Sequence, residues 1–241
     1  MKQISFIIPV FNEEANLRLL FQELKTVADR LGTPYEVIFV DDGSTDGGPA
    51  ILDDLARAHE QVRILAMDAN SGQSAALAVG FQAARGDVVV TLDADLQNDP
   101  ADLPAMLQLY GEYNMINGWR HNRRDTWSKR VASRIGNAVR NRLTGETIRD
   151  TGCSLKVMDA AMVKRIKMFR GLHRFLPTLM RLEGARVIEV KVNHRPRAGG
   201  VSKYTNLRRG WEGFQDLMAV RWMIRRALRT GHRERTPGAS A

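Results

Sequence analysis

Short apolar runs alternate with stretches of helical periodicity through the first half of this 241-residue chain. The β-branched runs predict strands at residues 4–9, 36–40, 62–67 and 88–92, and residues 115–119 are a candidate for a fifth strand. The stretches between them, where apolar residues recur every three or four positions, predict helices at residues 14–31, 48–59, 74–84 and 101–110. Strands that alternate with helices indicate an α/β fold with a mostly parallel central sheet flanked by helices.

The second half is less regular. Residues 183–192 predict one more strand, and residues 124–145 and 207–230 predict two amphipathic helices that carry many arginines. The first helix has Trp127 on its apolar side, and the second has Leu207, Trp211, Phe214, Met218 and Trp222. Basic amphipathic helices with aromatic residues are typical of segments that lie at a membrane interface. The alternative is an ordinary helix docked on the core.

This pattern divides the chain into a catalytic-domain candidate at residues 1–206, a basic C-terminal helix at 207–230 and a polar tail at 231–241, which we expect to be disordered. No stretch approaches the roughly 20 consecutive apolar residues that a membrane-spanning helix needs. We therefore expect a peripheral protein without a transmembrane helix. Cys153 is the single cysteine, so no intrachain disulfide forms, and a packing role is the simplest expectation for it.

The formal net charge is +9, and the basic residues gather in the second half of the chain. Such a balance favours an anionic partner: nucleic acid, anionic lipid or a phosphorylated substrate. No helix-turn-helix, zinc or RNP-type signature supports nucleic acid. The five histidines show no metal-ligand spacing.

The strongest chemical signal is Asp93-Ala94-Asp95-Leu96-Gln97, directly after the apolar run at 88–92. Two carboxylates one residue apart repel each other unless a cation or a proton lies between them. Mg²⁺ or Mn²⁺ held by one or two carboxylates and by phosphates fits this arrangement, at the strand end where open α/β sheets bind ligands. A helix N-terminus before Asp99-Pro100 is the alternative interpretation.

Polar segments follow three other predicted strands: Pro9 to Glu14, Asp41 to Asp46, and Asn70 to Ser74. Taken in order with the acidic pair, these segments resemble the inverting family 2 glycosyltransferases, whose GT-A fold is Rossmann-like. Three further segments resemble the polyprenyl-phosphate branch, which contains dolichyl-phosphate mannose synthase and bacterial undecaprenyl-phosphate relatives. They are Gly118-Trp119-Arg120, Arg149 to Lys156, and Arg197 to Tyr204.

The resemblance implies roles for individual positions. The nucleotide would be bordered by Pro9, Asn12, Glu14, Asp42, Asn70 and Asp93. The divalent cation, Mg²⁺ or Mn²⁺, would be surrounded by Asp93, Asp95 and Gln97. The acceptor phosphate or the leaving diphosphate would meet Arg120, Arg197, Ser202 and Lys203. The catalytic set would be Asp95, Asp150, Arg120 and Arg197, with Asp150 close to the reacting sugar as the family's candidate base.

The expected reaction moves one sugar from a nucleotide sugar, GDP-mannose or a UDP-sugar, to dolichyl or undecaprenyl phosphate at the cytoplasmic face of a membrane. A phosphate acceptor is mostly ionised near neutral pH, since its second pKa is about 6, so Asp150 is expected to position charge more than to remove a proton. A saccharide or glycolipid hydroxyl is the alternative acceptor and would require a base. Many relatives carry transmembrane helices after the catalytic domain. The alternatives for this chain are that it rests on the membrane through Trp127 and the helix from Trp211 to Trp222, that the gene was trimmed, or that a separate membrane subunit holds it.

Overall fold

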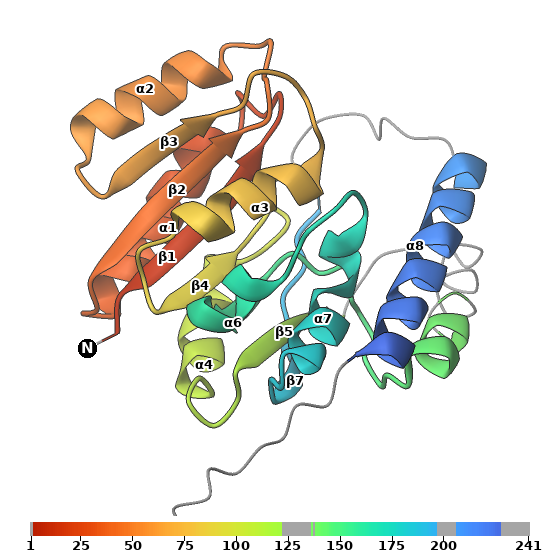
Figure 1. Cartoon of the computed structure of the whole chain (residues 1–241). Helices are drawn as coiled ribbons and strands as arrows, with labels where there is room; N and C mark the ends of the chain where they lie inside the picture. The colour runs from red at the N-terminus through yellow and green to blue at the C-terminus, as the bar shows by residue number, and fades with distance from the viewer. Residues whose placement is uncertain (1, 122–135, 137, 197–205, 228–241) are drawn as a thin grey trace, which may run out of the picture.

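The computed structural model describes residues 2–121, 136, 138–196 and 206–227. Its centre is a seven-stranded sheet with the order β3-β2-β1-β4-β6-β5-β7 (Figure 1). The strands are β1 (Ile4–Val10), β2 (Tyr35–Asp41), β3 (Val62–Ala66), β4 (Val88–Thr91), β5 (Met115–Arg120), β6 (Lys156–Asp159) and β7 (Val187–Val192). The mostly parallel α/β sheet expected from the sequence is confirmed.

One strand runs against the others. β6 pairs antiparallel with both β4 and β5, whereas all other pairs are parallel. The carboxyl ends of the other six strands therefore lie at one edge of the sheet, and the amino end of β6 lies at that same edge. The segment before β6 is thus brought to the edge where open α/β sheets bind their ligands.

Helices cover both faces of the sheet (Figure 1). The side chains of α1 (Leu17–Arg30), α2 (Gly48–Ala58), η1 (Pro100–Asp102) and α4 (Leu103–Gln108) pack on one face. Those of α3 (Gln73–Ala83), α6 (Ala160–Arg165), η2 (Leu172–Phe175), α7 (Leu176–Leu182) and α8 (Asn206–Arg226) pack on the other. The central strands β1, β2 and β4 are consequently buried from both sides, which explains why they appear in the sequence as nearly continuous apolar runs.

The second half departs most from the sequence prediction. β6, α6 and α7 were not predicted, and the predicted strand 183–192 begins only at Val187, because α7 ends in a turn at Gly184 with a positive φ of 88°. Of the predicted helix 124–145, residues 136 and 138–144 are helical and residues 122–135 and 137 lie outside the described part. The tail 231–241 lies outside it as well.

The helix α8 packs against the second core cluster mainly through residues that the sequence prediction did not single out, with Met218 of the predicted apolar side partly buried beside them. Leu217 and Val220 are buried in the core. Phe214 and Trp222 belong to the predicted apolar side, yet their side chains are 46% and 64% exposed. Successive residues turn by 100° around a helix, so these two sets face different directions. α8 therefore has one apolar face on the core and a second apolar stripe at the surface.

Candidate active site

The polar segments predicted from the sequence meet at one edge of the sheet. Asn12 follows β1, Asp42 follows β2, Asn70 follows β3 and Asp93 follows β4. Arg120 ends β5, and Asp150 precedes β6 at the same edge. This assembly follows from the strand directions alone, because six carboxyl ends and one amino end coincide there.

The acidic pair lies in a strained loop that is held by hydrogen bonds. Gln73 Nε2 donates to Asp93 Oδ1 at 2.8 Å, and the backbone N–H of Gln97 donates to Asp95 Oδ1 at 3.2 Å. Between them Leu96 adopts a φ of 60°, a left-handed conformation that is uncommon for a residue with a Cβ. Strain of this kind persists where surrounding contacts over-determine it, and it clusters at functional sites.

The two carboxylates behave as a pair that a cation would stabilise. Burial and the neighbouring charge of Asp95 raise the pKa of Asp93 to about 6, against the opposing influence of Ser154, Lys156 and Arg120. Asp95 is itself buried. Within the described residues, no group of three or more His, Cys, Asp or Glu side chains could hold a metal ion. Two carboxylates one residue apart fit a Mg²⁺ or Mn²⁺ ion that takes these two ligands from the protein and its other ligands from phosphates and water.

Arg120 carries the opposite charge to the acidic pair and forms an ion pair with Asp150. Arg120 Nε donates to Asp150 Oδ2 at 2.7 Å and Nη2 donates to Oδ1 at 2.8 Å, while the Arg120 backbone N–H also reaches Oδ2. The exposed fractions of the two side chains are 16% and 9%. Burial alone would raise the pKa of Asp150, but the hydrogen bonds and charge of Arg120 outweigh it and hold that pKa below its ordinary value. Asp150 is thus an ionised anchor for the guanidinium.

The backbone of Asp150 is fixed separately. Glu189 on β7 accepts from the N–H of Asp150 at 3.0 Å, and Asn117 Nδ2 on β5 donates to its carbonyl at 2.9 Å. The neighbouring strand β5 comes close to this segment because it carries Gly118, where a Cβ would lie 2.9 Å from the carbonyl oxygen of Leu155. The position of Asp150 therefore depends on contacts from β5 and β7 rather than on its own loop.

Two buried cations near Asp150 were not assigned a role from the sequence. Lys156, at the start of β6, is 2% exposed and donates to the carbonyl oxygens of Thr151 and Cys153. Arg140 belongs to the arginine-rich amphipathic helix predicted at residues 124–145, but it is buried and donates to Thr151 Oγ1 and to the carbonyl of Ile148, both at 2.6 Å. For Lys156 the sequence did offer a signal, because a lysine interrupts the otherwise apolar run from Leu155 to Met158. For Arg140 the helical periodicity gave no sign of burial.

The nucleotide-side residues cross-link their loops. Asp42 accepts from the backbone N–H groups of Ser71 (2.7 Å) and Gly72 (2.8 Å) and from Asn70 Nδ2 (3.1 Å). Asn12 Oδ1 accepts from the N–H of Thr45 at 2.7 Å. These contacts hold the ends of β1, β2 and β3 together.

Glu14 Oε2 accepts from the backbone N–H of Gly47 at 2.9 Å, so the end of the first predicted segment is also tied to the loop after β2. Pro9 lies within β1, paired with Val40. A nucleotide-binding role for Pro9, Glu14 and the other residues of this group stays a prediction. Arg197, Ser202 and Lys203 lie outside the described residues.

Cys153 is buried in the core, and burial raises the pKa of its thiol, so it is a protonated packing residue as expected. His173 contacts Ser74 Oγ through Nδ1 at 2.7 Å and links η2 to the start of α3.

Comparison with known proteins identifies the family. The model of the family described as glycosyl transferase family 2 matches residues 5–167. Dodecaprenyl-phosphate galacturonate synthase from Rhizobium johnstonii is 35% identical over 242 residues, covering 95% of this chain and 70% of that protein. Undecaprenyl-phosphate 4-deoxy-4-formamido-L-arabinose transferase from Aeromonas hydrophila is 36% identical over 206 residues, covering 85% of this chain and 63% of that protein. The chain thus spans roughly two thirds of the length of these relatives.

The fold is shared with glucosyl-3-phosphoglycerate synthase from Mycobacterium tuberculosis. Its crystal structure with Mn²⁺, uridine diphosphate and glucosyl-3-phosphoglycerate has a TM-score of 0.68 at 18% identity, covering 95% of this chain and 82% of that one. A second crystal structure of that enzyme, with Mg²⁺ and uridine diphosphate, gives a TM-score of 0.67. From the match over residues 5–167 and this shared GT-A architecture, the chain belongs to the family 2 glycosyltransferases.

Proposed function

We propose that this glycosyltransferase moves one sugar from a nucleotide-sugar donor to a polyprenyl phosphate, with Asp93 and Asp95 holding a divalent cation. The observation that carries the proposal is the pairing of opposite charges at one edge of the sheet: two close carboxylates after β4, and Arg120 with Lys156 acting electrostatically on Asp93. The relatives at 35% and 36% identity are named for polyprenyl-phosphate substrates, which supports this acceptor class.

The donor end of the reaction uses the acidic pair. Asp93 and Asp95, with Gln97 beside them, would hold Mg²⁺ or Mn²⁺, which when bound neutralises the negative charge that grows on the departing diphosphate. The Mycobacterium enzyme of the same fold has been crystallised with either ion. The loops tied together by Asn12, Asp42 and Asn70 are where the nucleotide would lie, by the strand-end rule for α/β sheets.

The acceptor end uses the guanidinium of Arg120. Its Nε and Nη2 are engaged by Asp150, which fixes the plane of the group and directs Nη1 outside the pair. A fixed guanidinium suits a phosphate oxygen, because the donor is already oriented when charge develops. Since Asp150 is ionised and doubly bonded to Arg120, it positions this cation, and the phosphate acceptor supplies its own nucleophilic oxygen. Arg197, Ser202 and Lys203 would complete the acceptor site.

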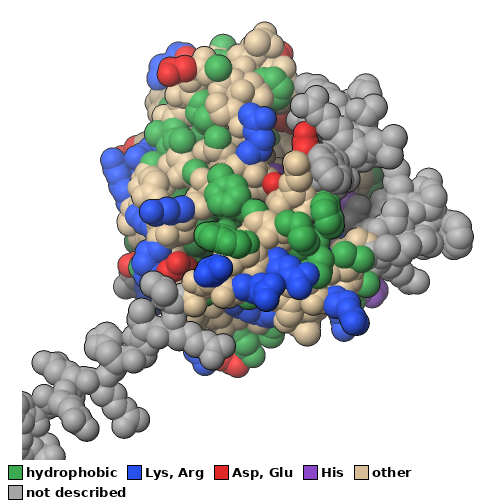
Figure 2. Space-filling model, turned by 45° about the vertical axis from the view of Figure 1, so that its right-hand side comes forward, with side chains coloured by type: hydrophobic (Ala, Val, Ile, Leu, Met, Phe, Trp, Pro, Cys, Tyr) green, Lys and Arg blue, Asp and Glu red, His purple; other side chains and the backbone are tan. Residues whose placement is uncertain are grey.

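We further propose that the protein works at an anionic membrane surface, on the cytoplasmic face, through the exposed stripe of α8. Phe214 and Trp222 stand at the surface, with Arg221, Arg225 and Arg226 on the same helix. Figure 2 shows hydrophobic side chains beside Lys and Arg side chains on this side of the molecule. Among the described helices, none is both long and apolar enough to cross a bilayer. Each basic residue near an anionic surface contributes about 1 kcal/mol to attachment.

The reaction is tested by a donor screen. The purified protein is incubated with GDP-mannose or UDP-sugars, a short polyprenyl phosphate, and Mg²⁺ or Mn²⁺, and the glycolipid product is identified by mass spectrometry. The proposal predicts a sugar phosphate ester of the lipid that forms only with the metal. Transfer to a saccharide or glycolipid hydroxyl in place of the lipid phosphate would contradict it.

Membrane attachment is tested by co-sedimentation with anionic vesicles. Replacement of Trp211 and Phe214 by Ser is expected to lower the bound fraction, as is Trp222→Ser. Leu19→Ser is a matched control, because Leu19 is 48% exposed but lies on α1, on the opposite face of the sheet. Unchanged sedimentation of the α8 variants, or an equal loss in the Leu19 variant, would overturn the interfacial role of this helix.

A further inference from the structure

The segment after β7 runs beside the loop that carries the acidic pair. Asn98 and His194 form an isolated antiparallel bridge, and the backbone N–H of Arg195 donates to the carbonyl of Gln97 at 3.0 Å. One step earlier, the N–H of Asn193 donates to Asp102 Oδ2 at 2.7 Å. Two loops that are far apart in the sequence are thus joined directly after Leu96, the residue with the strained backbone.

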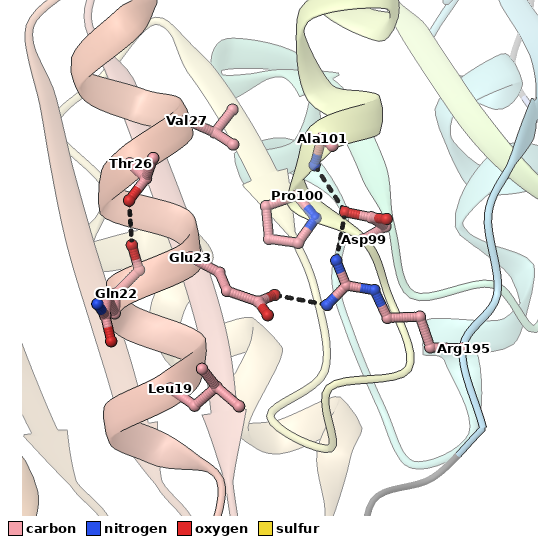
Figure 3. Close-up of a pocket in the computed structure, with 9 residues that line it drawn as sticks. All are labelled: Leu19, Gln22, Glu23, Thr26, Val27, Asp99, Pro100, Ala101 and Arg195. Carbon is pink, nitrogen blue, oxygen red and sulfur yellow. Dashed lines mark hydrogen bonds and ion pairs between the residues drawn. The ribbon is translucent and has the colours of Figure 1, made fainter.

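The side chain of Arg195 adds a second attachment to the same loop. Its Nη1 lies 2.6 Å from Glu23 Oε2 on α1, and its Nη2 lies 2.8 Å from Asp99 Oδ1. Figure 3 shows the guanidinium between these two carboxylates, at one side of a groove of about 360 Å³ between α1 and η1. Asp99 also accepts from the N–H of Ala101 and so begins η1. Arg195 therefore ties the loop after β4 to the helix α1.

This loop requires external support. The left-handed backbone at Leu96 costs conformational energy, and the carboxylates of Asp93 and Asp95 repel each other. Hydrogen bonds on one side come from Gln73 to Asp93 and from Ser154 Oγ to Asn98 Oδ1 at 2.6 Å. On the other side, the support comes from Arg195.

We propose that Arg195 is a positioning residue for the cation site: with its guanidinium on the carboxylate of Asp99, and its backbone N–H on the carbonyl of Gln97, it holds the 95–99 loop in the conformation that presents Asp95 beside Asp93. The guanidinium of Arg195 is paired with Glu23 and Asp99, so in this role it acts on the loop and not as a ligand of the cation. This inference rests on the proposed function, in which Asp93 and Asp95 hold Mg²⁺ or Mn²⁺.

The test measures Mn²⁺ binding directly, with uridine or guanosine diphosphate present, from the electron paramagnetic resonance signal of free Mn²⁺. Arg195→Ala is expected to weaken Mn²⁺ binding by three- to tenfold, while kcat at saturating Mn²⁺ stays within about twofold of the wild type. The Mn²⁺ affinity of Arg195→Lys should lie between those of the wild type and Arg195→Ala, because one ammonium group cannot span both carboxylates as the guanidinium does. The Mn²⁺ affinity of Glu23→Gln should also lie between those of the wild type and Arg195→Ala, since Arg195 keeps its contact with Asp99.

Arg18→Ala is the matched control. Arg18 is also on α1 and forms a 2.7 Å ion pair with Asp54, but that pair joins α1 to α2 and is more exposed than the pairs of Arg195. The Arg18→Ala variant should bind Mn²⁺ with the affinity of the wild type. If Arg195→Ala folds poorly by circular dichroism, Glu23→Gln provides the same test from the other end of the ion pair.

The outcomes separate the two hypotheses. If the wild type binds no Mn²⁺ with either nucleotide, the metal role of Asp93 and Asp95 fails, and the inference about Arg195 fails with it. If the wild type binds Mn²⁺ and both Arg195→Ala and Glu23→Gln bind it within twofold of the wild type, only the positioning role is overturned. An equal loss in Arg18→Ala would also overturn that role, because the effect would not be specific to this loop.

Discussion

Replacing Asp150 by Asn tests whether this carboxylate anchors Arg120 or acts as a base. The change keeps the size of the side chain but removes its charge, so Arg120 is left with a positive charge that is 16% exposed and has lost its partner. Removing one member of a buried ion pair costs about 3–5 kcal/mol. Since both side chains retain some contact with solvent, we expect the lower end, about 3 kcal/mol, which for a chain of this length lowers Tm by roughly 6–12 °C.

A double variant refines this prediction. Most of the penalty in Asp150→Asn comes from the unpaired cation, so adding Arg120→Gln should restore more than half of the lost Tm. Glu183→Gln is the matched control. It removes the carboxylate of the Arg165–Glu183 pair, whose side chains are 52% and 31% exposed, and exposed pairs contribute at most about 1 kcal/mol. A Tm of Asp150→Asn within 2 °C of the wild type, or a double variant with merely additive losses, would refute the anchoring role.

The rate measurement separates anchoring from base catalysis. Without its anchor, Arg120 is no longer a preoriented donor, and loss of one such donor typically lowers kcat by 10²–10³. The acidic limb of the pH–rate profile should keep its midpoint in Asp150→Asn, because a phosphate acceptor needs no base. Disappearance of that limb, together with recovery of the rate by added formate, would show that Asp150 removes a proton in the reaction.

Three further predictions concern the cation site, the acceptor and the core. Asp95→Asn should abolish transfer with little change in Tm, because it removes a proposed cation ligand from a carboxylate pair that repels itself; retained activity of the purified variant would contradict the metal role. Arg197→Ala should raise KM for the lipid phosphate more than KM for the nucleotide sugar, and equal losses would count against an acceptor role. Burial would raise the pKa of Glu36, but hydrogen bonds from Ser5, the N–H of Arg85 and Arg63 outweigh it and hold that pKa below its ordinary value. The resulting stabilisation is present above pH 4.5 and lost as the pH falls through the folded-state pKa, so a urea titration of wild type and Glu36→Gln should show a gap in unfolding free energy that narrows below pH 4.5.

The first half of the fold was predictable because its periodicities are strong and local. β1, β2 and β4 are short, mainly apolar runs, and α1 buries Leu17, Leu20 and Leu24 at helical spacing. The strand-end residues Asn12, Asp42 and Asp93 could be placed at one edge from connectivity alone, since parallel strands share a direction. The hydrogen bonds that join those loops to one another could not be predicted, because they link residues 20 to 33 positions apart.

The second half resisted prediction because its elements are short and depend on tertiary contacts. β6 has four residues and begins with a lysine, so no alternation identifies it. Arg140 resembled a solvated arginine of an amphipathic helix, yet it is buried because two oxygens of the 148–151 segment accept from it. The periodicity of the sequence does not distinguish a buried arginine from a solvated one.

The antiparallel insertion of β6 explains why the proposed site has both signs of charge. If the strand between β4 and β5 ran parallel to them, the segment before it would lie at the far edge of the sheet, and Asp150 could not reach Arg120. Because β6 enters in the opposite direction, its first residue, Lys156, and the preceding Asp150 lie at the same edge as Asp93. The cationic half of the site thus depends on the direction of a single four-residue strand, whereas the acidic half follows from the ordinary order of parallel strands. A substitution that weakens the contact of β5 with the 153–155 segment, such as Gly118→Ala, should therefore impair acceptor binding before it impairs donor binding, and separate KM values for the two substrates would show this.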